Sequence, residues 1–269
     1  MEKMNKTLTI GFSTLYKNYE SLKKKIDAIN SSSNSALMQN IEFLVIVQDS
    51  PADKIKKYGN IDVHYSVERG LSKSRNKVIS FSYSKYIWFL DDDVTLTCED
   101  LHKVLKYLSL FDADLFLGQI KSLDSDKPYK NYRRPFRSIF WPLRSSSIEI
   151  IVSRSFIQNN NISFNENLGL GTDYPTGEEN DFLIECKKKS VILKFIEEPI
   201  IKHPYEDKQR LERISKNIDK IIKVQGYLCK KYGFLLGPII FLYWSIKFTL
   251  KYKRISVLYH MYSGFFEKF

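Results

Sequence analysis

The sequence predicts an α/β protein with a mostly parallel sheet flanked by helices, followed by a helical, basic C-terminal extension. Short apolar runs typical of buried strands alternate with segments of helical periodicity, and polar residues directly follow several of these runs. The distribution of charge predicts that the extension is basic. Residues 201–269 hold 14 Lys or Arg and five Asp or Glu, which is nine of the eleven net positive charges. A chain of 269 residues is long enough for one large domain with an appendage.

Strands and helices are expected to alternate along most of the chain. The expected strands are 7–13, 41–48, 61–67, 86–90, 148–152 and 191–196. The expected helices are 18–29, 71–81, one that begins after the Thr97–Asp100 capping signal, and 178–189. Expected loops are 30–35, rich in Ser and Asn, the polar and aromatic stretch 121–147, and the Gly-containing stretch 159–174.

Three consecutive aspartates, Asp91, Asp92 and Asp93, end a strongly apolar run. Adjacent carboxylates repel one another, and a hard cation such as Mg²⁺ or Mn²⁺ would neutralise them. A solvated strand-to-helix turn, with Asp as turn and cap residues, is the simpler interpretation. In open parallel sheets, however, ligands bind at the carboxyl ends of the strands, and Ser13 and Asp49 also end strands. These residues are expected to share one edge of the sheet, which favours a binding site.

A second acidic cluster, formed by Glu178, Glu179 and Asp181, begins an expected helix. Thr176 and Glu179 fit a capping box, and acidic residues suit a first helical turn, so a structural role alone could explain the cluster. The Gly- and Pro-containing loop before it is not required by a simple cap. A carboxylate on a helix terminus that faces a metal site can serve as a general base.

In combination, three motifs resemble the family 2 glycosyltransferases of GT-A fold. They are Gly70-Leu-Ser-x-Ser-Arg-Asn76, Tyr86-Ile-Trp-Phe-Leu-Asp-Asp-Asp93 and Gly177-Glu-Glu-x-Asp-Phe182, and their order and spacing match over roughly residues 7–205. The resemblance implies a GT-A domain over residues 1–205 and a separate C-terminal region over 206–269. It also implies inverting transfer of a sugar from a nucleotide diphosphate sugar, with UDP as the expected nucleotide, to a hydroxyl of the acceptor.

The same resemblance implies where metal and nucleotide bind. Asp93 matches the metal ligand, with Asp91 and Asp92 on the metal or the ribose, and the implied cofactor is Mn²⁺ or Mg²⁺. The other residues that match nucleotide-binding positions are Ser13, Thr14, Asp49, Arg75 and Asn76.

The catalytic base is less sharply defined by the resemblance. Glu179 occupies the base position, but the family usually has Glu-Asp where this chain has Glu178-Glu179, so Glu178 and Asp181 remain alternatives. His203 lies where many GT-A enzymes have a late histidine near the metal or substrate. A histidine before a proline also often has a purely structural role.

The C-terminal region is expected to be amphipathic. Residues 205–231 predict a helix with an apolar face opposite Lys and Arg, and the apolar run 234–246 is too short, at about 20 Å, to cross a hydrocarbon core of about 30 Å. Basic and aromatic residues follow this run. The pattern favours docking in the plane of an anionic membrane surface, and packing on the domain or on a partner is the alternative.

The expected location is the cytoplasm, at the inner face of the cell membrane. Three cysteines without a CxxC spacing predict neither a disulfide framework nor a zinc site, and no signal peptide is expected. The expected partners are a nucleotide-sugar donor and a glycan or lipid-linked acceptor of polysaccharide biosynthesis, and no nucleic acid.

Two alternative functions are a nucleotidyltransferase and a non-catalytic protein that binds membrane or nucleic acid. A nucleotidyltransferase would be expected to carry a Gly-rich loop with a Lys after the first strand, and residues 12–16 contain no Gly.

Overall fold

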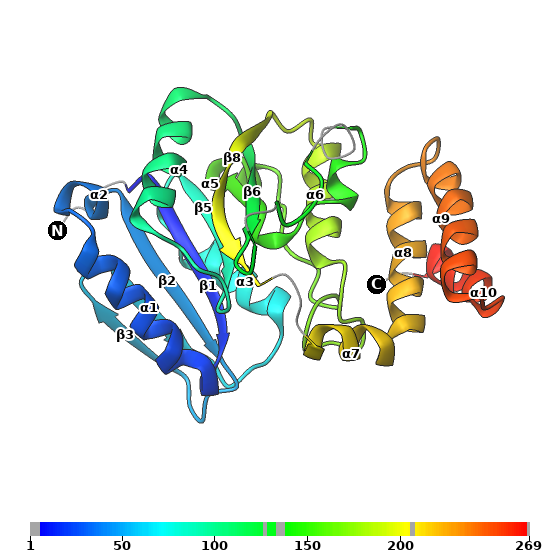
Figure 1. Cartoon of the computed structure of the whole chain (residues 1–269), viewed down its shortest axis with the longest axis horizontal. Coiled ribbons are helices and arrows are strands. Elements are labelled where there is room, and N and C mark those ends of the chain that lie inside the picture. Colours follow the sequence, from blue (N-terminus) through cyan, green and yellow to red (C-terminus); the bar gives the residue numbers. More distant parts are fainter. Residues whose placement is uncertain (1–5, 126–127, 133–137, 205–207, 268–269) are drawn as a thin grey trace.

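The computed structural model describes residues 6–125, 128–132, 138–204 and 208–267. Its central sheet contains, among these residues, eight strands in the order β3-β4-β2-β1-β5-β7-β6-β8 (Figure 1). The strands are β1 Leu8–Leu15, β2 Ile41–Gln48, β3 Lys54–Tyr58, β4 Ile61–Tyr65, β5 Tyr86–Asp91, β6 Leu115–Ser122, β7 Ile150–Ser153 and β8 Leu193–His203. Four pairs are parallel (β1 with β2, β1 with β5, β2 with β4, and β6 with β8), whereas β3 and β7 run antiparallel to their neighbours. This confirms the predicted α/β class.

Helices cover both faces of the sheet. The α-helices are α1 Tyr19–Ser32, α2 Ser35–Gln39, α3 Leu71–Phe81, α4 Cys98–Leu110, α5 Arg154–Asn159, α6 Glu178–Lys188, α7 Lys208–Lys216, α8 Ile218–Lys231, α9 Gly237–Tyr252 and α10 Ser256–Phe266. Short 3₁₀ helices in the described part of the chain lie at Tyr16–Asn18, Trp141–Leu143 and Ser147–Glu149.

The alternation of side chains along β1 shows which helices lie on each face of the sheet. Phe12 lines a cavity together with residues of α1 and α4, whereas the preceding Gly11 faces Val78 of α3. Successive residues of a strand point to opposite faces, so α3 lies across the sheet from α1 and α4. A Cβ atom at Gly11 would collide with the Val78 side chain, so glycine lets α3 lie directly against the strand.

Local sequence signals predicted several element boundaries closely. The predicted ranges 41–48 and 71–81 coincide with β2 and α3. Helix α4 begins with the predicted capping box, in which the Thr97 side chain accepts from the Asp100 amide and the Asp100 side chain accepts from the Thr97 amide. These signals hold because they depend on contacts within three or four residues.

Other predictions were wrong or incomplete. The stretch 30–35 is mostly helical, because α1 continues to Ser32 and α2 begins at Ser35. Strand β3 is fully exposed along its length, so it lacks the apolar run that identifies a buried strand. Strand β6 was not among the expected strands.

The C-terminal helices form a layered unit at the end of the molecule away from the N-terminus, with α8 between α6 on one side and α9 and α10 on the other (Figure 1). The single helix predicted over 205–231 is divided at Asn217 into α7 and α8, and its first residues lie outside the described part of the chain, as does the predicted domain boundary at 205. No helix among the described residues combines the length and apolar character needed to cross a bilayer.

Candidate active site

The carboxyl ends of β1, β2 and β5 bring together residues that are far apart in sequence. In the parallel ladder Ser13 lies beside Asp91, and Leu15 lies beside Gln48, the residue before Asp49. The predicted common edge is therefore present. This common edge forms because the parallel strands end in register, so that the segments after them leave the sheet at the same level.

Asp92 is held by the segment that follows β1. Its Oδ2 accepts hydrogen bonds from Thr14 Oγ1 at 2.5 Å and from Asn18 Nδ2 at 3.1 Å. Lys25 of α1 donates to the backbone carbonyl oxygens of Asp92 and Val94, at 2.8 and 3.2 Å. The loop that contains Asp91, Asp92 and Asp93, called the acidic loop below, is thus fixed through the Asp92 side chain and through its backbone.

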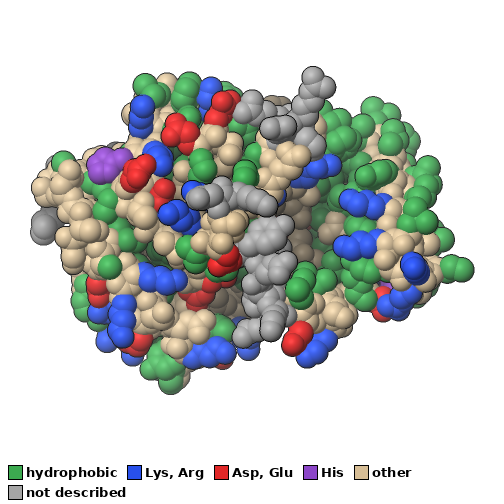
Figure 2. Space-filling model, in the orientation of Figure 1, with side chains coloured by type: hydrophobic (Ala, Val, Ile, Leu, Met, Phe, Trp, Pro, Cys, Tyr) green, Lys and Arg blue, Asp and Glu red, His purple; other side chains and the backbone are tan. Residues whose placement is uncertain are grey.

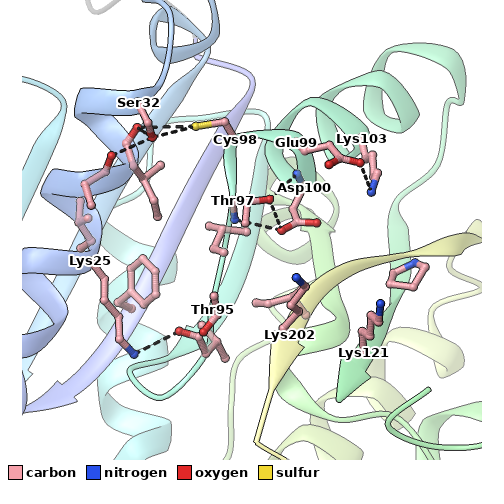
Figure 3. Close-up of a pocket in the computed structure, with 18 of the residues that line it drawn as sticks. Lys25, Ser32, Thr95, Thr97, Cys98, Glu99, Asp100, Lys103, Lys121 and Lys202 are labelled. Carbon is pink, nitrogen blue, oxygen red and sulfur yellow. Dashed lines mark hydrogen bonds and ion pairs between the residues drawn. The ribbon is translucent and has the colours of Figure 1, made fainter. Parts of the chain in front are cut away.

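The segment that follows the aspartates, residues 94–97, lines a cavity of about 880 Å³ between α1, α4 and the end of β8 (Figure 3). Lys25 reaches the acidic loop from α1, and Thr97 and Asp100 form the capping box on the other side of the loop. Thr95 joins β8 through reciprocal backbone hydrogen bonds with Lys202, at 2.9 and 3.0 Å. These contacts anchor the segment that links the acidic residues to α4.

Asp93 lies beside His203, the last residue of β8. Its Oδ2 is 3.3 Å from His203 Nε2, and the other ring nitrogen of His203 is 2.6 Å from the Pro204 carbonyl oxygen. Burial opposes ionisation of Asp93, but the hydrogen bond and charge of His203 outweigh it and lower the pKa of Asp93. In the same pair, burial disfavours the imidazolium, but Asp93 outweighs this effect and raises the pKa of His203. The structure therefore brings together two of the predicted metal-binding residues.

Arg75 of α3 connects the two acidic clusters. Its side chain is 2% exposed, and it donates to Asp91 Oδ1 at 3.1 Å, to Glu178 Oε1 at 3.0 Å and to Ser147 Oγ at 2.8 Å. Although about a third of the Asp91 side chain reaches solvent, burial raises the pKa of Asp91 against the opposing charge of Arg75. Arg75 is therefore a buried cation that pairs with one carboxylate from each acidic cluster.

The first turn of α6 carries the second acidic cluster. The predicted capping box was wrong, because the N-cap is Gly177, with φ of 86°, and no side chain caps the helix. Glu179 is therefore not used as a capping residue. Burial, and then the negative charge of the neighbouring Glu178, raise the pKa of Glu179 to about 8. A carboxyl group with such a pKa can accept a proton near neutral pH.

Asp181 has a different environment from the two glutamates. It is 2% exposed and accepts hydrogen bonds from Tyr227 and Lys231, both on α8. All three acidic residues predicted as candidate bases thus lie on the first turn of α6, but Glu178 is bonded to Arg75 in the site and Asp181 is bonded to the C-terminal helices.

The remaining predicted binding residues line or support the same edge. Ser13 accepts a hydrogen bond from Ser74 of α3 at 2.8 Å and is buried. Asp49 is exposed just after β2, with φ of 60°, a conformation that aspartate tolerates better than most residues. Asn76 holds the 159–174 loop: its amide exchanges two hydrogen bonds with the Phe164 backbone, at 2.8 and 2.9 Å, and donates to Glu166.

The predicted loop 159–174 contains α5's last residue and then packs against the start of α3. Ser72 donates to the Leu168 carbonyl at 2.6 Å, and the Leu71 amide donates to the Leu170 carbonyl at 2.8 Å. Gly171 has φ of 92°, and a Cβ there would lie 3.2 Å from Gly70 Cα, so this contact needs glycine. The first and third sequence motifs therefore meet through this loop.

The polar stretch 121–147, of which residues 126–127 and 133–137 lie outside the description, is attached to α6. Asn180 donates to the carbonyls of Pro142 and Ser145, at 2.7 and 3.3 Å. Lys130 lies 2.5 Å from the fully buried Glu149. These contacts place the described end of the stretch beside the second acidic cluster.

Sequence analysis missed several residues that organise the site. Ser147 bonds to Arg75, Lys25 holds the acidic loop, and Tyr227 and Lys231 hold Asp181. Their partners lie from 46 to 72 residues away in the chain, so no local pattern could have pointed to them.

Within the described residues, no group of three or more His, Cys, Asp or Glu side chains is arranged to hold a metal ion. The available donors are instead the Asp93 carboxylate and the His203 imidazole as an adjacent pair. Two protein ligands suit an ion such as Mg²⁺, which is usually bound through one or two carboxylates together with substrate phosphates and water.

The chain belongs to glycosyl transferase family 2, whose family model matches residues 14–169. It is therefore a glycosyltransferase, and the matched region contains the strand-end aspartates and Arg75. No curated protein sequence matches the chain.

Among solved structures, the chain is similar to S. aureus TarS. The structure of TarS 1-349 has a TM-score of 0.63 at 11% identity, and the similarity covers 97% of this chain and 72% of that one. TarS 1-349 in complex with UDP-GlcNAc gives a TM-score of 0.65 at 11% identity, with coverage of 93% and 74%. At this identity the likeness establishes the fold, including its GT-A character.

Proposed function

We propose that the protein is an inverting, metal-dependent glycosyltransferase that moves a sugar from a nucleotide diphosphate sugar to a hydroxyl of a glycan or lipid-linked acceptor in the biosynthesis of bacterial surface polysaccharide. The observation that carries the proposal is the ion-pair chain from Asp91 through Arg75 to Glu178. It joins the strand-end aspartates and the first turn of α6 into one site.

The donor is proposed to bind at the carboxyl edge of the sheet. Asp49, Asp91 and Asp92 follow or end the central strands there, as in other open α/β sheets that bind nucleotides. TarS, which shares the fold, has been crystallised with UDP-GlcNAc, and this supports UDP as the first nucleotide to test.

Mn²⁺ or Mg²⁺ is the proposed cofactor, with Asp93 and His203 as its protein ligands and Asp91 close by in sequence. The donor set fits: Asp93 offers a carboxylate oxygen, the neutral imidazole of His203 would offer a nitrogen beside it, and the diphosphate and water would complete the coordination. When bound, the ion would stabilise the negative charge that develops on the departing nucleoside diphosphate.

Glu179 is the proposed general base. Its carboxylate removes the proton of the acceptor hydroxyl while that oxygen forms a bond to the anomeric carbon. The bond between the anomeric carbon and the diphosphate oxygen breaks, and its electron pair leaves with the nucleotide. Attack from the face opposite the leaving group inverts the anomeric configuration. Glu178, paired with Arg75, raises the pKa of Glu179 through its negative charge.

The C-terminal unit is proposed to dock on the inner face of the cell membrane. Side chains of α9, α10 and the residues just before each of them form an exposed apolar surface, and Lys and Arg side chains lie among them (Figure 2). The most exposed are Phe234, Leu235, Ile239, Leu242, Leu250, Ile255 and Tyr259, and the nearby cations are Lys247, Lys251, Lys253 and Arg254. An apolar surface bordered by cations suits anionic lipid. We expect the protein to sediment with anionic vesicles but not with neutral vesicles. Failure to sediment with either kind of vesicle would oppose docking.

Thermal stability in the presence of nucleoside diphosphates tests the donor site. UDP, GDP and ADP should each be added with and without Mn²⁺ to the wild type, to Asp93→Ala and to the control Asp112→Ala, an exposed residue beyond α4. A ligand at a hundred times its Kd stabilises the folded state by about 2.7 kcal/mol. We expect a shift for one nucleotide that needs Mn²⁺, persists in Asp112→Ala and disappears in Asp93→Ala.

The alternatives lead to different results when the corresponding nucleoside triphosphates are added to the same experiment. A nucleotidyltransferase should be stabilised by nucleoside triphosphates more than by diphosphates. If no nucleotide stabilises the wild type, the catalytic proposal fails, and a non-catalytic membrane- or nucleic-acid-binding role takes its place.

A further inference from the structure

The first turn of α6, which carries Glu179, is bonded to two cationic side chains from different parts of the fold. Arg75 of α3 bonds to Glu178. Lys231 of α8 lies 2.5 Å from Asp181 Oδ1, and the Tyr227 hydroxyl donates to the same oxygen at 2.7 Å. The turn that carries Glu179 is therefore fixed at two points, at Glu178 by α3 and at Asp181 by α8.

Burial makes the contact with α8 a strong restraint. The Asp181 and Lys231 side chains are only 3% and 14% exposed, and Lys231 also lies 3.1 Å from Glu185, one turn further along α6. Burial opposes the charge of Lys231, but Asp181 outweighs it and raises the pKa of Lys231. The contact is largely withdrawn from water, where salt screens an ion pair least.

Apolar packing brings the same two helices into close contact. A Cβ at Gly177, the residue before α6, would lie 2.5 Å from Val224 Cγ1 of α8. A small cluster of buried side chains joins the loop before α6, α6 itself and α8; it contains Leu168, Ile184, Val224 and Leu228. Helix α8 is in turn held by α10, because Cβ atoms at Gly226 or Gly264 would collide with the backbone of the other helix.

We propose that Asp181 is a positioning residue, and that with Lys231 and Tyr227 it holds the first turn of α6 so that Glu179 faces the acceptor. The C-terminal helices are then a working part of the catalytic site as well as a docking surface. This inference rests on the proposed transferase activity. It also removes Asp181 from the candidate bases, since its carboxylate oxygen is occupied by two donors from α8.

Helical geometry explains why one contact can orient the base. Asp181 lies three residues after Glu178, on nearly the same side of the helix, and two residues after Glu179, on nearly the opposite side. Fixing Asp181 against α8 therefore sets the rotation of the turn, which directs Glu179 away from α8. Loss of the contact would let this turn rotate or fray without removing any group that touches substrate.

Steady-state kinetics on the full chain test the proposal with Asp181→Asn, Lys231→Met, the double variant and the milder Tyr227→Phe. We expect each of the first two to lower kcat about 10- to 100-fold, with the KM for the donor changed less than about threefold, since misplacement of a reacting group acts mainly on turnover. The double variant should be no worse than the more severe single variant, because both changes remove the same contact. Lys231→Arg should retain most activity, and Lys230→Met, which changes the exposed neighbouring lysine, should behave as wild type.

Several outcomes would overturn the proposal. An inactive Asp181→Asn together with a fully active Lys231→Met would make Asp181 the base. Wild-type kcat in both variants, or lowered stability with unchanged kcat, would make the contact purely structural. A shift in the pH dependence of kcat/KM in Lys231→Met is expected, because the environment of Glu179 changes with the turn.

Hydrogen exchange provides a test that does not depend on activity. In Lys231→Met, amides of residues 178–183 should exchange at least about tenfold faster, while amides of α4 keep their wild-type rates. Unchanged exchange at 178–183 would overturn the positioning role. If the wild type has no transferase activity but exchange responds as expected, the proposed function has failed and the restraint itself stands.

Discussion

Asp93, just after β5, and Glu179, in the first turn of α6, are carboxylates of the proposed site, and their surroundings shift their pKa values in opposite directions. The carboxylate of Asp93 is half exposed and lies beside the imidazole of His203, and its pKa is lowered. Glu179 is largely surrounded by protein and adjoins another carboxylate, and its pKa is raised to about 8. Titratable groups whose environments separate their pKa values generally have different chemical roles.

The contrast supports the proposed division of roles, with a fixed charge in one cluster and proton transfer in the other. A group that stays anionic over the working pH range suits a cation and a diphosphate. A group that changes charge near neutral pH suits a general base. Arg75 bonds to Asp91 in one cluster and to Glu178 in the other, and so keeps the two clusters adjacent. The pKa values of Asp93 and Glu179 nevertheless shift in opposite directions.

The largest expected effect comes from removing the proton acceptor. Glu179→Gln should lower kcat about 10²–10⁴-fold, the range for general acid–base catalysis, with little change in nucleotide affinity. In the wild type, kcat/KM should rise with pH through about 8, as Glu179 loses its proton. The control Glu20→Gln, an exposed glutamate of α1, should behave as wild type.

Glu178→Gln distinguishes the two glutamates. Because Glu178 is the buried partner of Arg75, this variant should lose stability as well as activity, whereas Glu179→Gln should not be destabilised. If Glu178→Gln abolished turnover and Glu179→Gln retained it, the assignment of the base would be reversed.

The next largest effect is expected on stability. Arg75→Met leaves Glu178 and Asp91 without their cation, and removing one partner of a buried ion pair costs about 3–5 kcal/mol. Urea unfolding measures this loss. Lys73→Met, two residues earlier on α3 with an exposed pair to Glu68, should cost no more than about 1 kcal/mol. Equal losses in the two variants would mean that Arg75 does not join the clusters.

The most gradual expected effect is the pH dependence of stability. Glu179 has a folded pKa above the ordinary value of 4.5, so the unfolded chain releases its proton first as the pH rises. The free energy of unfolding should therefore fall between about pH 4.5 and pH 8, by at most about 1.4 kcal/mol per pH unit for one proton. Denaturant titrations of metal-free wild type and Glu179→Gln compare the slopes. A steeper fall in Glu179→Gln would contradict the raised pKa.

The elements that sequence analysis predicted best are those that depend on neighbours in the chain. Strand β2, helix α3 and the Thr97–Asp100 capping box follow from periodicity and local hydrogen bonds. Strand β3 was missed because its five residues are all exposed and its pairing with β4 is its main stabilising contact. The split of the predicted 205–231 helix at Asn217 was missed because the apolar pattern continues through it.

By itself, the sequence determined the α/β class, the strand-end aspartates and the acidic start of α6, because strand and helix signals are local and three motifs occur in a specific order. Only the tertiary structure decided what each acidic residue contacts. Arg75 lies 103 residues from Glu178, and Asp181 lies 50 residues from Lys231, so their pairing depends on how the layers pack. A pKa depends on burial and on nearby charge, and both exist only once the chain has folded.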